Sequence, residues 1–206
     1  RFLIPATQTG EGDEWYWSEK AILSYHDSLN ELRTALSNLK GSAKPAYMFA
    51  HVKYMHYPYY DDVNMTEKDW AKLTPRSREL MKAYVAHPEK YPEKLPVVEV
   101  MLNSFSLLEK MFGLKTKVLS AAGIISDPAR TEVWRKSPGF EEDVALVKEL
   151  YDLKMTHFDG ILGDILNLFG DEELKKNTIV LFIGDHGEAL MDHGILGHSV
   201  NVYEEM

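Results

Sequence analysis

A carboxylate and an imidazole stand side by side directly after the most apolar run of this chain. Asp185 and His186 follow residues 179–183, Ile-Val-Leu-Phe-Ile, and His193 and His198 come within the next dozen residues. Histidine is the commonest metal ligand and proton carrier, and a carboxylate beside it adds an oxygen ligand. The spacing therefore predicts a metal or anion site. One Asp-His pair would fit an ordinary polar loop equally well, but the added histidines disfavour that interpretation.

The apolar run predicts the element that positions these side chains. Every residue from 179 to 183 is β-branched, aromatic or otherwise apolar, which is typical of a strand covered on both faces in a parallel sheet. In open α/β sheets, ligands bind beyond the carboxyl ends of the strands, where Asp185 and His186 would lie. Adjacent residues on a strand point to opposite faces. Both side chains can therefore reach one ion only if the chain turns after Ile183, which Gly184 permits.

The segment from Gly184 to Glu205, GDHGEALMDHGILGHSVNVYEE, resembles the C-terminal metal-binding segment of the sulfatase branch of the alkaline phosphatase superfamily. In that family a strand ends in Asp-His-Gly-Glu, followed by His-Gly, Gly-His and Tyr-Glu-Glu. The resemblance implies that Asp185 and His186 hold one divalent metal ion, with Ca²⁺, Zn²⁺ and Mn²⁺ all open. It also implies that His193 and His198 bind the substrate, and that His198 is catalytic.

A second segment carries the same resemblance independently. Residues 46–52 predict another strand, and His51, His56, Pro58 and Tyr59 match a family loop of histidine, four residues, histidine, one residue, proline and tyrosine. The resemblance implies that His56 contacts the sulfate or phosphate group and takes part in catalysis. It implies a substrate-binding position for His51 as well. Packing of His56 in an aromatic turn is the alternative.

The resemblance implies an α/β fold, an alkaline-phosphatase-like three-layer sandwich with a mostly parallel central sheet. We expect this sheet to contain residues 46–52 and 178–183. Apolar residues at a spacing of three and four predict flanking helices over 18–40 and 141–169. Residues 1–206 are then expected to form an incomplete domain of this kind.

The sequence at about 61–138 predicts helices and loops, and we expect this region to be a variable helical insertion. Thr66 is a candidate helix start, with acidic residues in the first turn. The apolar stretch from Pro96 to about Phe112 is either an amphipathic helix packed on the domain, which we favour, or a lid or lipid-facing element over the active site.

Composition limits the class of protein. The formal net charge of −9 argues against a nucleic-acid partner, which would call for a basic face. The chain has no cysteine, so disulfides and a cysteine nucleophile are excluded within it. The chain contains no run of 18 apolar residues, the length that would predict a transmembrane helix. An exported location (periplasmic, secreted or lumenal) is favoured by the resemblance alone.

The family's nucleophile is a formylglycine made from Cys or Ser in sulfatases, or a Thr in phospho-transferring relatives. It comes, with further acidic metal ligands, from an N-terminal segment for which there is no room before Ser18. We therefore expect this chain to carry the C-terminal half of the active site of a sulfatase-like, metal-dependent hydrolase of sulfate esters. We also expect it to need the missing N-terminal segment and to show negligible turnover alone.

Two other functions stay open at this point. One is a phosphoryl-group transferase or phosphodiesterase of the same superfamily, which would act on a phosphate ester. The other is a non-catalytic remnant of the fold that binds a metal or a partner.

Overall fold

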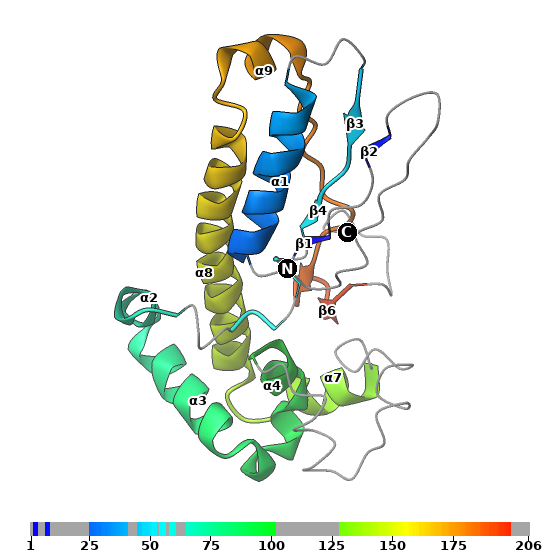
Figure 1. Cartoon of the computed structure of the whole chain (residues 1–206). Helices are drawn as coiled ribbons and strands as arrows, with labels where there is room; N and C mark the ends of the chain where they lie inside the picture. The colour runs from blue at the N-terminus through cyan, green and yellow to red at the C-terminus, as the bar shows by residue number, and fades with distance from the viewer. Residues whose placement is uncertain are drawn as a thin grey trace. The chain divides into compact units, whose positions relative to one another are not determined.

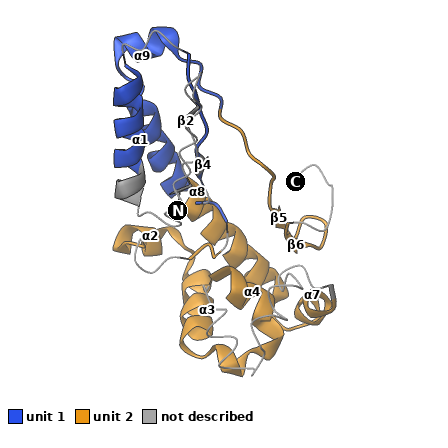
Figure 2. Ribbon diagram, turned by 45° about the vertical axis from the view of Figure 1, so that its right-hand side comes forward, with its two compact units in different colours: residues 1–56, 156–181 blue, residues 57–155, 182–206 orange. Residues whose placement is uncertain are grey.

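The computed structural model describes residues 2–3, 7–8, 25–40, 45–52, 54–56, 58–60, 65–101 and 128–198 (Figure 1). The chain forms two compact units, which Figure 2 shows in different colours. Unit 1 comprises Arg1–His56 and Thr156–Leu181, and unit 2 comprises Tyr57–Met155 and Phe182–Met206. The long helix α8 (Phe140–Asn167) contributes its first part to unit 2 and its last part to unit 1.

Unit 1 contains helices and two short antiparallel strand pairs among its described residues. Helix α1 (Tyr25–Leu39) buries Leu32 and Leu36, which lie one turn apart on one face. Asp171 caps α9 (Glu172–Asn177) by accepting hydrogen bonds from two backbone N–H groups, and it also pairs with Lys40 at 2.7 Å. The strands pair as β1 (Phe2–Leu3) with β4 (His51–Val52), and β2 (Thr7–Gln8) with β3 (Tyr47–Met48).

Unit 2 holds a larger hydrophobic core. Its elements are α2 (Glu67–Lys72), α3 (Pro75–Ala86), η1 (Pro88–Lys90), η2 (Pro92–Lys94), α4 (Leu95–Met101), α7 (Pro128–Arg135), the first part of α8, β5 (Ala189–Leu190) and β6 (Leu196–Gly197). The core side chains without exposed surface are Met81, Val97, Val98, Val100, Met101, Trp134, Leu146, Val147, Leu150 and Leu196. The core therefore joins the helices to strand β6.

Local sequence explains where the helices of unit 2 begin. Thr66 forms a capping box with Asp69: each side chain accepts a hydrogen bond from the other residue's backbone N–H. Thr74 caps α3, with Pro75 at the first helical position. Thr74 also donates hydrogen bonds to both carboxylate oxygens of Glu149, at 2.8 and 3.0 Å, which ties the start of α3 to α8.

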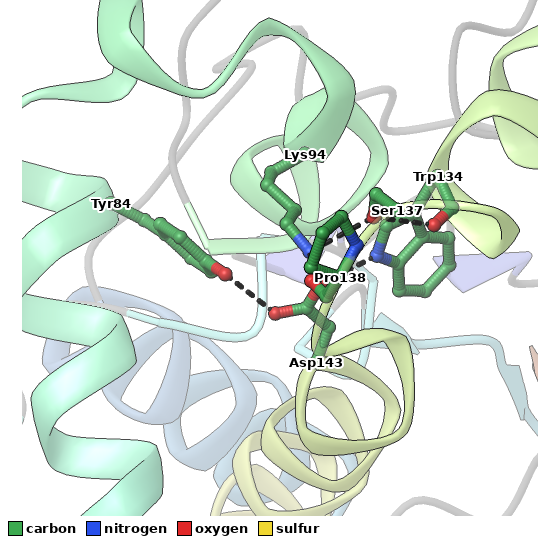
Figure 3. A network of polar contacts seen from close by, with 6 residues as sticks. All are labelled: Tyr84, Lys94, Trp134, Ser137, Pro138 and Asp143. Atoms are coloured by element: carbon green, nitrogen blue, oxygen red, sulfur yellow. Dashed lines mark hydrogen bonds and ion pairs between the residues drawn. The ribbon is translucent and has the colours of Figure 1, made fainter.

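A buried polar network crosses the core of unit 2 (Figure 3). Asp143 has no exposed surface and accepts hydrogen bonds from Tyr84 Oη at 2.7 Å, Lys94 Nζ at 2.6 Å and Trp134 Nε1 at 2.9 Å. Burial, and secondly this hydrogen bond, raise the pKa of Tyr84, so its hydroxyl stays a donor.

The Lys94 ammonium group of this network has a hydrogen-bond acceptor for each of its donors. Besides Asp143, Lys94 Nζ donates to Ser137 Oγ at 2.9 Å and to the Pro138 carbonyl at 2.5 Å. An ammonium group has three donors, so each of them has an acceptor. The network holds η2, the α7–α8 junction and α3 together through one carboxylate.

The helix predictions are confirmed within the described residues. The helix expected over 141–169 is α8 (Phe140–Asn167), and the helix expected over 18–40 is α1 (Tyr25–Leu39), with 18–24 outside the described residues. A helix starts after Thr66 as predicted. Residues 95–101 form a helix packed in the core, as favoured for the start of that apolar stretch. The rest of the stretch, to about residue 112, lies outside the described residues, so the choice between the two alternatives stays open there. In the described residues, no helix is both long enough and apolar enough to cross a bilayer.

The expected parallel sheet is not confirmed. Among the described residues, strands occur as antiparallel pairs of two residues each, and 46–52 divides into β3 and β4, which pair in different sheets. Residues 178–183 do not pair, and Ile179, Leu181 and Ile183 are 89%, 83% and 79% exposed. A parallel strand takes its neighbours from distant segments through crossover connections, and the described residues place no such neighbour beside this run.

Candidate functional site

The candidate site is built on a small β-hairpin of unit 2. Strands β5 and β6 pair in antiparallel register, Ala189 with Gly197 and Leu190 with Leu196. Leu196 is fully buried in the core and Ala189 is nearly so, which fixes the hairpin on the unit. A β-turn closes the hairpin: the Gly194 N–H donates to the Met191 carbonyl at 3.0 Å.

Two helices hold the tip of this hairpin. Arg135 of α7 donates from Nη2 to the Gly194 carbonyl at 2.7 Å. Lys148 of α8 pairs with Asp192 at 2.8 Å, and this hydrogen bond holds the pKa of the Asp192 carboxyl below its usual range. The hairpin is thus fixed at its tip by side-chain contacts and along its length by core packing.

At the open end of the hairpin, Glu188 and His198 form a close pair. Glu188 Oε1 lies 2.9 Å from His198 Nδ1, and the two side chains are only 6% and 14% exposed. The Glu188 charge also helps to raise the pKa of Tyr151, after burial as the main cause.

His186 lies against the same pair. The ring centroids of His186 and His198 are 4.3 Å apart, with the ring planes tilted by 31°. His186 Nδ1 lies 2.8 Å from the Gly187 carbonyl, which can only accept, so Nδ1 carries the proton. The lone pair of His186 is then on Nε2, which lies 3.9 Å from Asp185 Oδ2.

The separation of Asp185 and His186 is compatible with two ligands of one divalent metal ion. Two ligands that each lie 2.0–2.2 Å from one ion can be at most about 4.4 Å apart, so the distance between Asp185 Oδ2 and His186 Nε2 is within range. Metal-bound histidines usually donate their other ring N–H to a carbonyl or carboxylate, as His186 does to Gly187. Among the described residues, no group of three or more His, Cys, Asp or Glu side chains is arranged to hold a metal.

The remaining predicted residues lie elsewhere. His193 is exposed in the turn of the hairpin, at the opposite end from His198. His51 lies in β4, paired with Leu3, and His56 is exposed just after that strand; both belong to unit 1. The convergence of His56 with Asp185 stays a prediction, because the two residues belong to different units.

Comparison with known proteins places the chain in a family. The Sulfatase family model matches residues 7–205, so the chain belongs to the sulfatase family, within the alkaline phosphatase superfamily. This confirms the membership predicted from the motifs, and it implies an alkaline-phosphatase-like α/β fold.

Two individual proteins match the chain over shorter segments than the family model does. The chain is 34% identical over 53 residues to arylsulfatase K of Gallus gallus, and 33% identical over 57 residues to arylsulfatase K of Xenopus laevis. These alignments cover 26% and 28% of this chain, and they span only 10% and 11% of the relatives. No solved structure matches the chain.

The sequence patterns gave no role to three residues of the site. Glu188 was part of the matched motif, but its contact with His198 follows only from the register of the hairpin. Arg135 and Lys148 are distant in sequence and reach the hairpin through the packing of α7 and α8. A signal that could have found Glu188 is the rule that a metal-bound histidine usually has an acceptor for its second ring nitrogen.

Proposed function

We propose that this chain contributes Asp185, His186 and His198 to the active site of a sulfatase-like, metal-dependent hydrolase of sulfate esters. Membership of the sulfatase family and the arylsulfatase relatives support the reaction class. The observation that carries the proposal is that Asp185 and His186 place an oxygen and a nitrogen ligand close together, while the ring of His186 also contacts the ring of His198.

Asp185 and His186 would hold the metal ion through Oδ2 and Nε2. A divalent ion there supplies Lewis-acid stabilisation of the charge on the sulfuryl oxygens. Carboxylate and imidazole together suit Zn²⁺ or Mn²⁺, and Ca²⁺ stays open as a third choice. The Gly187 carbonyl contributes by fixing the tautomer and the ring orientation of His186.

His198 and His56 would act on the substrate. An imidazole N–H beside a sulfate ester can donate to its oxygens and can protonate the leaving alcohol. The roles of His51 and His193 as substrate-binding residues rest on the family resemblance, as does an exported location. We also propose that the region at about 61–138 is a helical insertion that supports the site, since Arg135 holds the hairpin tip.

The test compares Asp185→Asn with Asp159→Asn in the full-length protein. Asp159 is an exposed carboxylate on α8 and serves as the matched control. Hydrolysis of 4-nitrophenyl sulfate and of 4-nitrophenyl phosphate would be measured, together with bound metal by elemental analysis.

We expect the Asp185 variant to lose both metal and sulfate hydrolysis, while the control keeps both. An Asp185 variant with full activity would overturn the assignment of the metal ligand. Hydrolysis of the phosphate ester alone would favour the phosphoryl-transferring relatives instead.

A further inference from the structure

The register of the hairpin makes Glu188 and His198 partners. Along two antiparallel strands, each step forward on one strand is matched by one step back on the other. Ala189 is opposed to Gly197, and the next residue, Leu190, is opposed to the preceding one, Leu196. Glu188 and His198 continue the same series one step beyond the strands. Their side chains are 2.9 Å apart at that position. The contact is therefore set by the strand pairing and not by a chance approach of two loops.

We propose that Glu188 is the positioning residue for His198: it holds Nδ1 of the ring and so presents Nε2 as the atom that acts on the substrate. This proposal rests on the function proposed above for His198. An ionised carboxylate can only accept a hydrogen bond. Nδ1 of His198 therefore carries a proton in the pair, and the second ring nitrogen is directed away from Glu188.

Burial makes this hydrogen bond effective. The Glu188 side chain is 6% exposed and that of His198 is 14% exposed, so water competes little for either group. By contrast, the chain holds a similar pair in the open: His87 Nδ1 lies 3.3 Å from Glu89 Oε1, with both side chains 55% exposed. The two pairs have the same chemistry and differ in burial, which makes the second a matched control.

Contacts on two sides fix the ring of His198. Glu188 holds its Nδ1 edge, and the ring of His186 lies against its face with centroids 4.3 Å apart. Rotation of the His198 side chain would break both contacts. Since His186 is the proposed metal ligand, Glu188 sets the position of the second imidazole relative to the first.

The first experiment measures the ring directly. Histidine ring nitrogens of the metal-free protein, labelled with ¹⁵N, would be read by long-range ¹H–¹⁵N NMR at pH ~9, where neutral imidazole is the ordinary form. His198→Gln would assign the resonances. We expect the wild-type protein and Glu188→Gln, which keeps an acceptor oxygen, to show His198 protonated on Nδ1. Glu188→Leu should lose this preference, and Glu89→Leu should leave the His198 resonances unchanged.

The second experiment measures catalysis by the full-length protein with its metal. We expect Glu188→Leu to lower kcat for 4-nitrophenyl sulfate by about 10–100-fold, the range found when the outer hydrogen-bond partner of a metal-ligating histidine is removed. KM should change much less, and Glu188→Gln should recover most of the loss. Glu89→Leu should match the wild type in both constants.

The outcomes separate this proposal from the proposed function. A His198 ring protonated on Nε2 in the wild-type protein overturns the positioning role without any variant, even if Glu188→Leu does not fold. Equal kcat for wild-type protein and a folded Glu188→Leu variant overturns it as well. If no sulfate ester is hydrolysed but the NMR results are as expected, the reaction class is wrong and the positioning of His198 by Glu188 stands.

Discussion

Removal of the Asp143 carboxylate should strongly destabilise unit 2. In Asp143→Ala, the Lys94 ammonium would stay buried, with a side chain only 5% exposed, and would lose its counter-charge. Tyr84 and Trp134 would lose the acceptor of their hydrogen bonds at the same time.

The magnitude follows from the burial of the pair. Removing one partner of a buried ion pair typically costs about 3–5 kcal/mol, because the remaining charge is uncompensated. Two donors left without an acceptor would add up to about 1–3 kcal/mol each, less whatever water entering the space restores. We therefore expect the free energy of unfolding to fall by at least about 3 kcal/mol. A typical domain has about 5–15 kcal/mol in total, so the variant should be close to its unfolding limit.

Urea unfolding, followed by tryptophan fluorescence, would measure the loss. The double variant Lys94→Met with Asp143→Leu removes both charges. It should be less destabilised than Lys94→Met alone or Asp143→Leu alone, so the two changes are not additive. The control is Asp192→Ala, which breaks an exposed pair with Lys148 and should cost less than about 1 kcal/mol. A loss below about 1 kcal/mol for Asp143→Ala, or strictly additive single changes, would contradict the reasoning.

Two further predictions concern the hairpin tip. Gly194 has a φ of +70°, and a Cβ there would overlap Nη2 of Arg135. Gly194→Ala should therefore lower the free energy of unfolding by about 1–3 kcal/mol, measured in thermal or urea melts. If adding Arg135→Ala recovers none of this loss, the overlap is not its cause. The pKa of Asp192 is lowered by Lys148, so the pair stabilises the fold above about pH 4, the unfolded value, and this contribution disappears as pH falls through the lower folded pKa. Asp192→Asn should remove that part of the acid dependence in melts between about pH 2 and 6, and an unchanged pH profile would show that the pair contributes nothing.

Local patterns predicted the helices and part of the site. The apolar spacing gave α8 to within two residues of its ends, and the capping signal at Thr66 gave the start of α2. Both depend on residues close in sequence. The adjacency of Asp185 and His186 is visible in the sequence, and their role as metal ligands stays a prediction.

Features that depend on distant residues were not predictable in the same way. The contact of Glu188 with His198 requires the hairpin register, which the turn at Asp192 and His193 sets. The anchoring of that turn by Arg135 requires the packing of α7. The apolar run 178–183 satisfies every local criterion for a buried strand, but strand burial is decided by neighbours that a local pattern does not contain.

The exposed run has a consequence for how the protein behaves in concentrated solution. Residues 178–183 contain no charge, proline or glycine, and they combine β-branched, aromatic and leucine side chains. This composition is the signature of segments that stack into dry, interdigitated strand assemblies when they are uncovered. Natural sheets blunt such edges with charges or proline, and this run carries neither. We therefore expect copies of this chain to associate through residues 178–183 as protein concentration rises, because the run exposes apolar side chains and its backbone lies outside the described strand pairs.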